Sequence, residues 1–272
     1  MTMEHENEYP DSMVDMCELI WGKGFLAPGG EGHVEKMVQG VELEGRRVLD
    51  IGCGLGGPAC ILAGKHGAHV VGTDLEVPLI DRARRRAADL GIGDRAVFEV
   101  VQTGPLTFED ECFDLVMSSG GITQTTDKLG TFKECLRVLK PGGHFRLYDW
   151  MKSEGEYSDD MRYWFKMEGL TYSMQTSKHQ DATLREVGFT DVRVVDGSDW
   201  YRKEVMAEYE RMQTRDYPRL ATLIGTLAAD HAVENWRAMT VVCEKGEMLQ
   251  VYSGARRRSG MRTPRPRLEN FC

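Results

Sequence analysis

The run from Val48 to Gly57 (VLDIGCGLGG) constrains the fold more than any other part of the chain. A short apolar segment ends in Asp50 and passes directly into a glycine-rich turn, and a helix-compatible stretch, 58–66, follows. Glycines in such a turn let backbone N–H groups approach a ligand, and the start of a helix adds a partial positive charge. The run therefore predicts the strand–turn–helix unit of a nucleotide-binding α/β domain. A turn that uses its glycines only for tight packing is the alternative.

Two acids indicate which nucleotide this turn binds. Gly52, Gly54 and Gly57 also fit the dinucleotide pattern G-x-G-x-x-G. Asp50 would repel a pyrophosphate, whereas it would attract the α-ammonium group of S-adenosylmethionine. Asp74 ends the next predicted strand, 22 residues after Gly52, where it can bind two ribose hydroxyls. The pattern favours S-adenosylmethionine as the cofactor and leaves an NAD-dependent oxidoreductase as the alternative enzyme class.

Strands and helices alternate along the chain up to Trp150. This alternation predicts an α/β fold with a doubly wound, mostly parallel, seven-stranded sheet. The predicted strands are the run before Gly52 and residues 69–74, 97–101, 113–118, 143–150, 190–196 and 248–255. The predicted helices are residues 13–21, 33–41, 58–66, 79–90, 129–139, 179–187, 201–213 and 221–245.

Changes in composition divide the chain into five parts. Residues 1–32 predict an N-terminal lid segment, and residues 33–150 a cofactor-binding core. Residues 151–178 are rich in aromatic residues and methionine, so we expect a helical insertion that caps the substrate over the carboxyl edge of the sheet. Residues 179–255 would complete the domain. The arginine-rich tail, 256–272, is expected to be disordered and solvated.

Charge and cysteine usage restrict the class of partner. The net charge of −9 argues against nucleic acid or an anionic membrane, so a small-molecule substrate is expected. The seven cysteines include no C-x-x-C pair, which predicts reduced thiols and no metal site. With no signal peptide or long apolar segment, we expect a cytoplasmic protein. The oligomeric state stays open.

The other strand ends supply the remaining cofactor contacts, because ligands of open α/β sheets bind outside the carboxyl ends of the strands. Leu75 is expected to pack on the adenine, and Gln102 with Thr103 to bind its polar edge. Ser118 and Ser119 begin a Gly-Gly turn that we expect to pass under the methionine part. The alternatives are a surface polar residue for Gln102 and a plain flexible turn for the glycines.

The run at Asp50 resembles the first motif of class I S-adenosylmethionine-dependent methyltransferases. The segment 136–145 (LRVLKPGGHF) is similar to the post-helix signature of the same superfamily. In these enzymes an acid usually follows the third strand, where this chain has Gln102. An amide oxygen can accept the same bond from the adenine amino group without assistance from charge.

The rest of the chain resembles the phosphoethanolamine N-methyltransferases. Tyr9, the segments 17–22 (CELIWG) and 25–30 (FLAPGG), and the segment 198–201 (SDWY) carry this resemblance. It implies that Leu26 and Ala27 contact the cofactor and that Tyr9 closes a lid over it. In that family a lid tyrosine pairs with a catalytic histidine. Here the histidine position aligns with Gln124, so Tyr9 and Gln124 are the expected catalytic residues.

The chain departs from that family wherever the substrate is bound. The acid that holds the substrate amine aligns near Gly120. The phosphate-binding arginine and tyrosine fall near Gly169 and Thr171, and the lysine near Met239 or Thr240. These losses argue against phosphoethanolamine. They favour N-methylation of a small amine of the choline or betaine type. S-methylation of a thioether or thiol is the alternative, and a non-catalytic cofactor-binding module is the rival outside enzymes.

Aromatic residues gather in the segments expected to form the substrate pocket. Aromatic faces stabilise a cation, so they can favour the onium charge that develops during methyl transfer to an amine. For each residue, packing in the lid or core is the competing explanation. The expected substrate contacts are Trp21, Trp150, Trp164, Tyr172 and Trp200.

Overall fold

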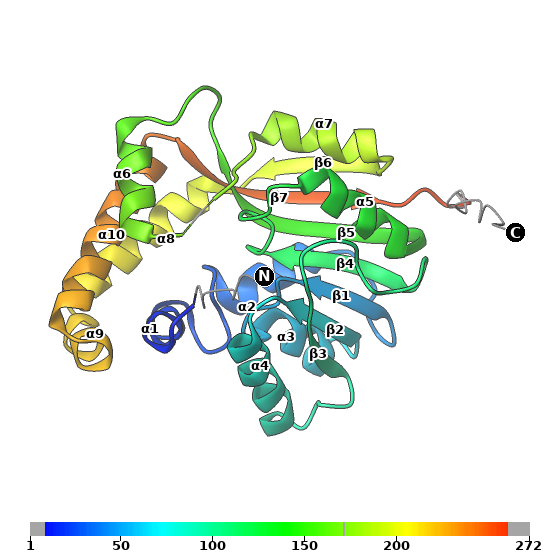
Figure 1. Cartoon of the computed structure of the whole chain (residues 1–272), viewed down its shortest axis with the longest axis horizontal. Helices are drawn as coiled ribbons and strands as arrows, with labels where there is room; N and C mark the ends of the chain where they lie inside the picture. The colour runs from blue at the N-terminus through cyan, green and yellow to red at the C-terminus, as the bar shows by residue number, and fades with distance from the viewer. Residues whose placement is uncertain (1–8, 171, 261–272) are drawn as a thin grey trace, which may run out of the picture.

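A twisted seven-stranded sheet forms the centre of the computed structural model, which describes residues 9–170 and 172–260 (Figure 1). Its strands run in the order β3-β2-β1-β4-β5-β7-β6. β1 to β5 are parallel, and β7 lies antiparallel between β5 and β6. This is the doubly wound, mostly parallel sheet that the sequence predicts. The strands are β1 (Arg47–Ile51), β2 (His69–Asp74), β3 (Ala96–Val100), β4 (Phe113–Ser119), β5 (Leu139–Lys152), β6 (Thr190–Asp196) and β7 (Met248–Arg256).

Helices cover both faces of this sheet. α2 (Gly30–Val38), α3 (Gly57–Lys65) and α4 (Val77–Asp89) pack on one face, and α5 (Lys128–Val138) and α7 (Ser177–Val187) on the other. Successive strand residues point to opposite faces, so Val48 joins the first of these cores and Leu49 the second. Burial on both faces explains why β1 is apolar at successive positions.

The other helices form a cap with a core of its own (Figure 1). They are α1 (Asp11–Trp21), α6 (Asp159–Glu168), α8 (Ser198–Gln213), α9 (Tyr217–Ile224) and α10 (Thr226–Glu244). The sequence predicts a cap only from 151–178, where the structure has α6. Helices from both ends of the chain complete it. The continuous helix predicted over 221–245 is wrong, because Gly225 adopts φ +87° and ψ 153° and separates α9 from α10.

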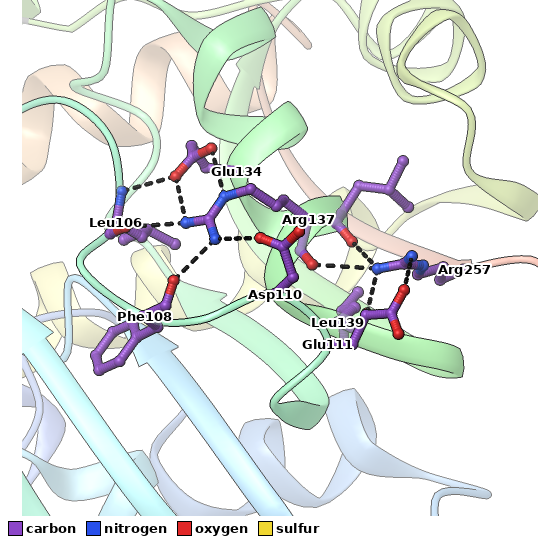
Figure 2. Close-up of polar contacts among 9 residues, drawn as sticks. Leu106, Phe108, Asp110, Glu111, Glu134, Arg137, Leu139 and Arg257 are labelled. Carbon is purple, nitrogen blue, oxygen red and sulfur yellow. Dashed lines mark hydrogen bonds and ion pairs between the residues drawn. The ribbon is translucent and has the colours of Figure 1, made fainter. Parts of the chain in front are cut away.

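Arg256 and Arg257 correct the prediction for the tail. Arg256 ends β7, and Arg257 is 2% exposed. The Arg257 guanidinium donates to the carbonyls of Leu136, at 3.1 Å, and Leu139, at 2.6 Å, at the end of α5 (Figure 2). It also pairs with Glu111 at 2.6 Å. Unpaired carbonyls at a helix end attract a cation, so this arginine is structural. Residues 261–272 of the predicted tail lie outside the described residues.

A second arginine fixes the loop that leaves β3 toward the carboxyl edge. Arg137 donates to the carbonyls of Leu106 and Phe108 at 2.9 and 2.8 Å, and it pairs with Asp110 and Glu134 (Figure 2). Both arginines bind near the junction where α5 ends and β5 begins. The loop that begins at residue 101 is therefore tied to the body of the fold.

The described residues give two further results. None of their helices is long and apolar enough to cross a membrane. The cysteines described are free thiols, as the sequence predicts: Cys17, Cys53, Cys60, Cys112, Cys135 and Cys243.

Candidate functional site

A cavity of about 620 Å³ lies at the carboxyl edge of the sheet, under the cap. The N-terminal segment, the ends of β1, β2 and β4, the loop after β3 and parts of the cap line it. Most residues predicted for the site meet here. They are Tyr9, Trp21, Leu26, Ala27, Asp50, Gly52, Gly54, Asp74, Leu75, Gln102, Thr103, Ser119, Gln124, Trp150 and Tyr172.

Three residues that were predicted to contact the cofactor or the substrate are not among the described residues that line the cavity. Ser118 is 0% exposed and lies behind Gly121, so a ligand contact is the wrong prediction. Trp164 is 0% exposed and stacks on Tyr172, with ring centroids 5.4 Å apart, so it supports the wall from behind. Trp200 packs toward Gly29 between the two cores. For these two tryptophans, packing explains the aromatic residue.

Asp50 is the group in the cavity that most needs a ligand. It is 0% exposed, and neither carboxylate oxygen has a hydrogen-bond partner among residues 9–170 and 172–260. Burial, with the nearby charge of Asp74, raises the pKa of this carboxyl to about 8. A buried acid without partners is costly. A ligand that brings an ammonium group to Asp50 would remove this cost and restore the ionised form.

Glycines close the backbone around Asp50. Gly52 and Gly121 touch across the ends of β1 and β4, and a Cβ on Gly52 would lie 2.8 Å from the Gly121 Cα. Gly52 and Gly54 also adopt φ of +67° and +52°, which suits glycine. The lid loop covers this turn, because a Cβ on Gly54 would lie 3.1 Å from Leu26. Loop-to-loop contact, rather than space for a substrate, therefore explains why Gly121 is glycine.

Asp74 completes the half of the cavity suited to a nucleoside. One carboxylate oxygen accepts from the Gly54 N–H at 2.9 Å and the other from the Glu76 N–H at 3.1 Å. Each oxygen keeps a lone pair for a further donor, such as a ribose hydroxyl. Burial raises the pKa of Asp74, and the backbone N–H groups oppose the shift. Leu75 and Gln102 line the cavity beyond it.

Tyr9 and Gln124 connect the N-terminal segment to the loop after β4. The Tyr9 hydroxyl donates to the Gln124 amide oxygen at 3.3 Å, as the resemblance implies for this pair. The buried Lys128 holds the loop from below, donating to the carbonyls of Ile122 at 2.6 Å and Thr125 at 3.0 Å. Burial lowers the pKa of Lys128, and the charge of Asp149 opposes this. Gln124 is therefore held on both sides.

A polar cluster in the cap half of the cavity was not predicted from the sequence. Glu168, at the end of α6, accepts from the Tyr172 hydroxyl at 2.9 Å and from the Asn235 amide of α10. Glu168, Tyr172, Asn235, Trp236 and Gln250 all line the cavity. Glu168 adjoins Gly169, one of the positions aligned with the family's phosphate site. No sequence signal connects it to Asn235, which is 67 residues away.

The lining of the cavity is acidic. Among the residues that the structure describes, none of those lining it is Lys, Arg or His. Lys166 and Arg237 lie outside the lining, and Arg237 pairs with Glu234 at 2.6 Å. Met239 and Thr240 are buried in α10, and Thr171 lies outside the described residues. The carboxylates of the lining are Asp50, Asp74, Glu76, Asp127, Glu134 and Glu168.

Comparison with proteins of known sequence indicates the family to which this chain is similar. Residues 49–147 match the family described as methyltransferase domain. Phosphoethanolamine N-methyltransferase 1 of Arabidopsis thaliana is 29% identical over 241 residues, which cover 88% of this chain and 48% of that protein. The chain thus spans about half the length of the curated plant relatives it matches.

Solved structures share the fold. Haemonchus contortus phosphoethanolamine N-methyltransferase 2, in complex with phosphomonomethylethanolamine and S-adenosylhomocysteine, has a TM-score of 0.86 at 24% identity, covering 93% of this chain and 59% of that one. A Galdieria sulphuraria protein described as a sarcosine dimethylglycine methyltransferase has a TM-score of 0.77 at 18% identity, covering 92% and 98%. The chain therefore carries a methyltransferase domain with the class I, S-adenosylmethionine-dependent fold, and it resembles the phosphoethanolamine N-methyltransferases.

Proposed function

We propose that this protein is an S-adenosylmethionine-dependent methyltransferase that acts on a small molecule. The observation that carries the proposal is Asp50, a buried carboxylate without a partner in the described chain, beside the glycine turn of the cavity. S-adenosylmethionine brings an ammonium to this carboxylate and has no phosphate. A dinucleotide would bring a pyrophosphate to the same place, so an NAD-dependent oxidoreductase fits less well.

The residues around the cavity divide the cofactor between them. Asp50 would pair with its ammonium, and the backbone at Gly52 and Gly54 would approach its methionine part. Asp74 would accept from the ribose hydroxyls, Leu75 would pack on the adenine, and Gln102 with Thr103 would bind the adenine edge. Bound there, the cofactor supplies an activated methyl group on a sulfonium. Tyr9 and Leu26 would close the lid and exclude water.

The acceptor that this cavity fits best is a small amine without a phosphate. A phosphate needs cationic partners. Although curated relatives are named for phosphoethanolamine, none of the described residues that line this cavity is basic. Asp50 and Asp74 would bind the cofactor and Glu134 pairs with Arg137, but Glu168 remains in the cap half, where it favours a neutral or cationic acceptor. Gln124 cannot take a proton as a histidine does, so the acceptor nitrogen would have to arrive unprotonated.

A sulfur acceptor is the second candidate, because a thioether also carries no proton on its nucleophilic atom. The two differ in pH dependence. The rate on a thioether should be nearly constant between about pH 6 and 9, while a tertiary amine should show only its own titration.

Two experiments test the proposal. Calorimetric titration with S-adenosylmethionine and with NAD should show binding of the first and not of the second. Transfer of labelled methyl groups is then measured onto amines, amino acids, thioethers and phosphoethanolamine. We expect a tertiary amine to be methylated and phosphoethanolamine to be a poor substrate. Efficient turnover of phosphoethanolamine would refute the argument from charge, and binding without any transfer would favour a non-catalytic module.

A further inference from the structure

Two side chains at the cap end of the cavity donate hydrogen bonds to one carboxylate. Glu168 ends α6, and both of its oxygens are occupied once, by the Tyr172 hydroxyl and by the Asn235 side-chain amide. Asn235 is 6% exposed and lies on α10, so the cluster joins two helices of the cap. All three residues line the cavity. We call them the Glu168 cluster.

The hydrogen bonds within the Glu168 cluster determine which atoms a ligand meets. An ionised carboxylate only accepts, so Asn235 turns its Nδ2 toward Glu168, and Tyr172 donates its single O–H there. The remaining capacity is mainly that of acceptors: lone pairs on the Glu168 and Tyr172 oxygens and the Asn235 Oδ1, beside the second N–H of the Asn235 amide. This Oδ1 is buried, with no hydrogen-bond partner in residues 9–170 and 172–260. The cluster therefore lacks a donor from the ligand side.

The walls beside the Glu168 cluster are aromatic. Trp150 lies 5.7 Å from the Tyr172 ring, and Trp236 lies 5.6 Å from Trp21, as centroid distances. All four rings line the cavity. The indole N–H groups of Trp21 and Trp236 each donate at 2.9 Å to Glu208, which is 1% exposed. Aromatic faces with carboxylates beside and behind them attract a cation.

We propose that the Glu168 cluster is a subsite for a second, protonated nitrogen of the methyl acceptor, so that the preferred acceptors are small diamines. The proposal rests on the methyltransferase function above and specifies its substrate class. An ammonium has three donors and no acceptor, which matches the unfilled acceptor atoms of the cluster. The unprotonated nitrogen of the same molecule would face Gln124 and receive the methyl group. The carbon–sulfur bond then breaks, sulfur keeps the electron pair, and the positive charge passes to the methylated nitrogen.

The relatives named for phosphoethanolamine would lead one to expect an anionic phosphate at this place, whereas the proposed ligand group is a cation. Of the positions aligned with the phosphate-binding residues, Gly169 follows the end of α6, and Met239 and Thr240 lie on α10. The Glu168 cluster presents a carboxylate and an amide on the same two elements. A phosphate there would face Glu168 with no basic residue from the described lining. Burial raises the pKa of Glu168, the hydrogen bonds from Asn235 and Tyr172 oppose this shift, and a bound ammonium would oppose it further.

Two amines of equal shape test the subsite. Dimethylaminopropylamine carries a terminal ammonium where dimethylbutylamine has a methyl group. Rates are compared per concentration of unprotonated tertiary amine, because the terminal ammonium lowers the pKa of that nitrogen. We expect kcat/KM for the diamine to exceed that of the monoamine by about 10- to 100-fold, because its ammonium gains charge-assisted hydrogen bonds. Equal values for the two amines in the unmodified protein would overturn the proposal, and this comparison requires no variant.

The variant Glu168→Gln keeps the shape and removes the charge. It should raise KM for the diamine about tenfold or more, so that the preference of the unmodified protein for the diamine over dimethylbutylamine is lost. Glu234→Gln is the matched control, because Glu234 precedes Asn235 on the same helix and pairs outward with Arg237. Glu234→Gln should leave kcat and KM for both amines unchanged. A preference for the diamine that survives in Glu168→Gln would refute the subsite.

Affinity for S-adenosylhomocysteine, measured on each protein, separates the two levels of the argument. If the unmodified protein does not bind it, the proposed methyltransferase function itself fails. If the unmodified protein and both variants bind S-adenosylhomocysteine equally and neither amine is methylated, the diamine subsite is overturned. The methyltransferase function would then require a different acceptor.

Discussion

Replacing Asp50 by asparagine should stabilise the free protein while it weakens ligand binding. The carboxyl is 0% exposed with a pKa of about 8, against the ordinary value of 3.8 that represents the unfolded chain. Between these values the folded state holds a proton that the unfolded state has lost, so the stability of the unmodified protein falls as pH rises. The side-chain amide introduced by Asp50→Asn does not titrate, so the variant escapes this decline.

The size of the effect follows from the shift. Each pKa unit corresponds to about 1.4 kcal/mol, so the stability of Asp50→Asn relative to the unmodified protein should increase by about 1.4 kcal/mol per pH unit from about pH 5 to 8. Above pH 8 the difference should stay constant. Urea unfolding of both proteins at several pH values measures it. A difference that is independent of pH would show that Asp50 is not held as a neutral acid in the free protein.

Ligand binding should favour the unmodified protein, whereas stability favours Asp50→Asn. Affinity of the unmodified protein for S-adenosylhomocysteine should rise about tenfold per unit between about pH 5 and 7, because binding requires Asp50 to release its proton. Asp50→Asn should lack this slope and bind about 10- to 100-fold more weakly at neutral pH. Calorimetry in buffers of different ionisation enthalpy counts the released proton. Saturating ligand should also remove the pH-dependent stability difference, which serves as the internal control.

Four further substitutions test other parts of the structure. Tyr9→Phe and Gln124→Ala should each lower kcat by no more than about tenfold with an unchanged melting temperature, since each removes one hydrogen bond of the lid; a loss of several orders of magnitude would indicate direct proton transfer. Gly121→Ala should weaken cofactor binding and cost about 1–3 kcal/mol of stability, because its Cβ would lie 2.9 Å from the Gly52 Cα; full cofactor affinity would contradict this. Arg257→Ala should cost about 3 kcal/mol in urea unfolding and leave KM unchanged, and an altered KM would mean that the α5 end influences the cavity.

The sheet and the cofactor half of the cavity were predictable because their signals are local. An apolar strand, an acid and a glycine turn adjoin in the chain around Asp50, and each parallel strand brings its own end to the same edge. The Tyr9–Gln124 contact was also anticipated, although only through a resemblance to known enzymes.

The errors arise where distant contacts decide the outcome. Arg257 belongs to an arginine-rich stretch that is typical of solvated tails, and only the carbonyls of α5 make it a buried residue. Gly225 interrupts an otherwise helical pattern, and its positive φ becomes evident only when α9 and α10 pack as separate helices. Glu168 gains its place in the site from the meeting of α6 with α10, which no spacing in the sequence reveals.

The pairing of Trp21 with Trp236 gives the lid an optical signal of its own. Trp21 belongs to α1, at the start of the chain, and Trp236 to α10, near its end, and both indoles bind the same carboxylate, Glu208. Any movement of α1 away from α8 and α10 must separate the two rings and remove one indole from that charge. Indole emission depends on such surroundings, so lid opening and product release can be followed in real time by intrinsic fluorescence. Trp21→Phe identifies the part of the signal that comes from α1.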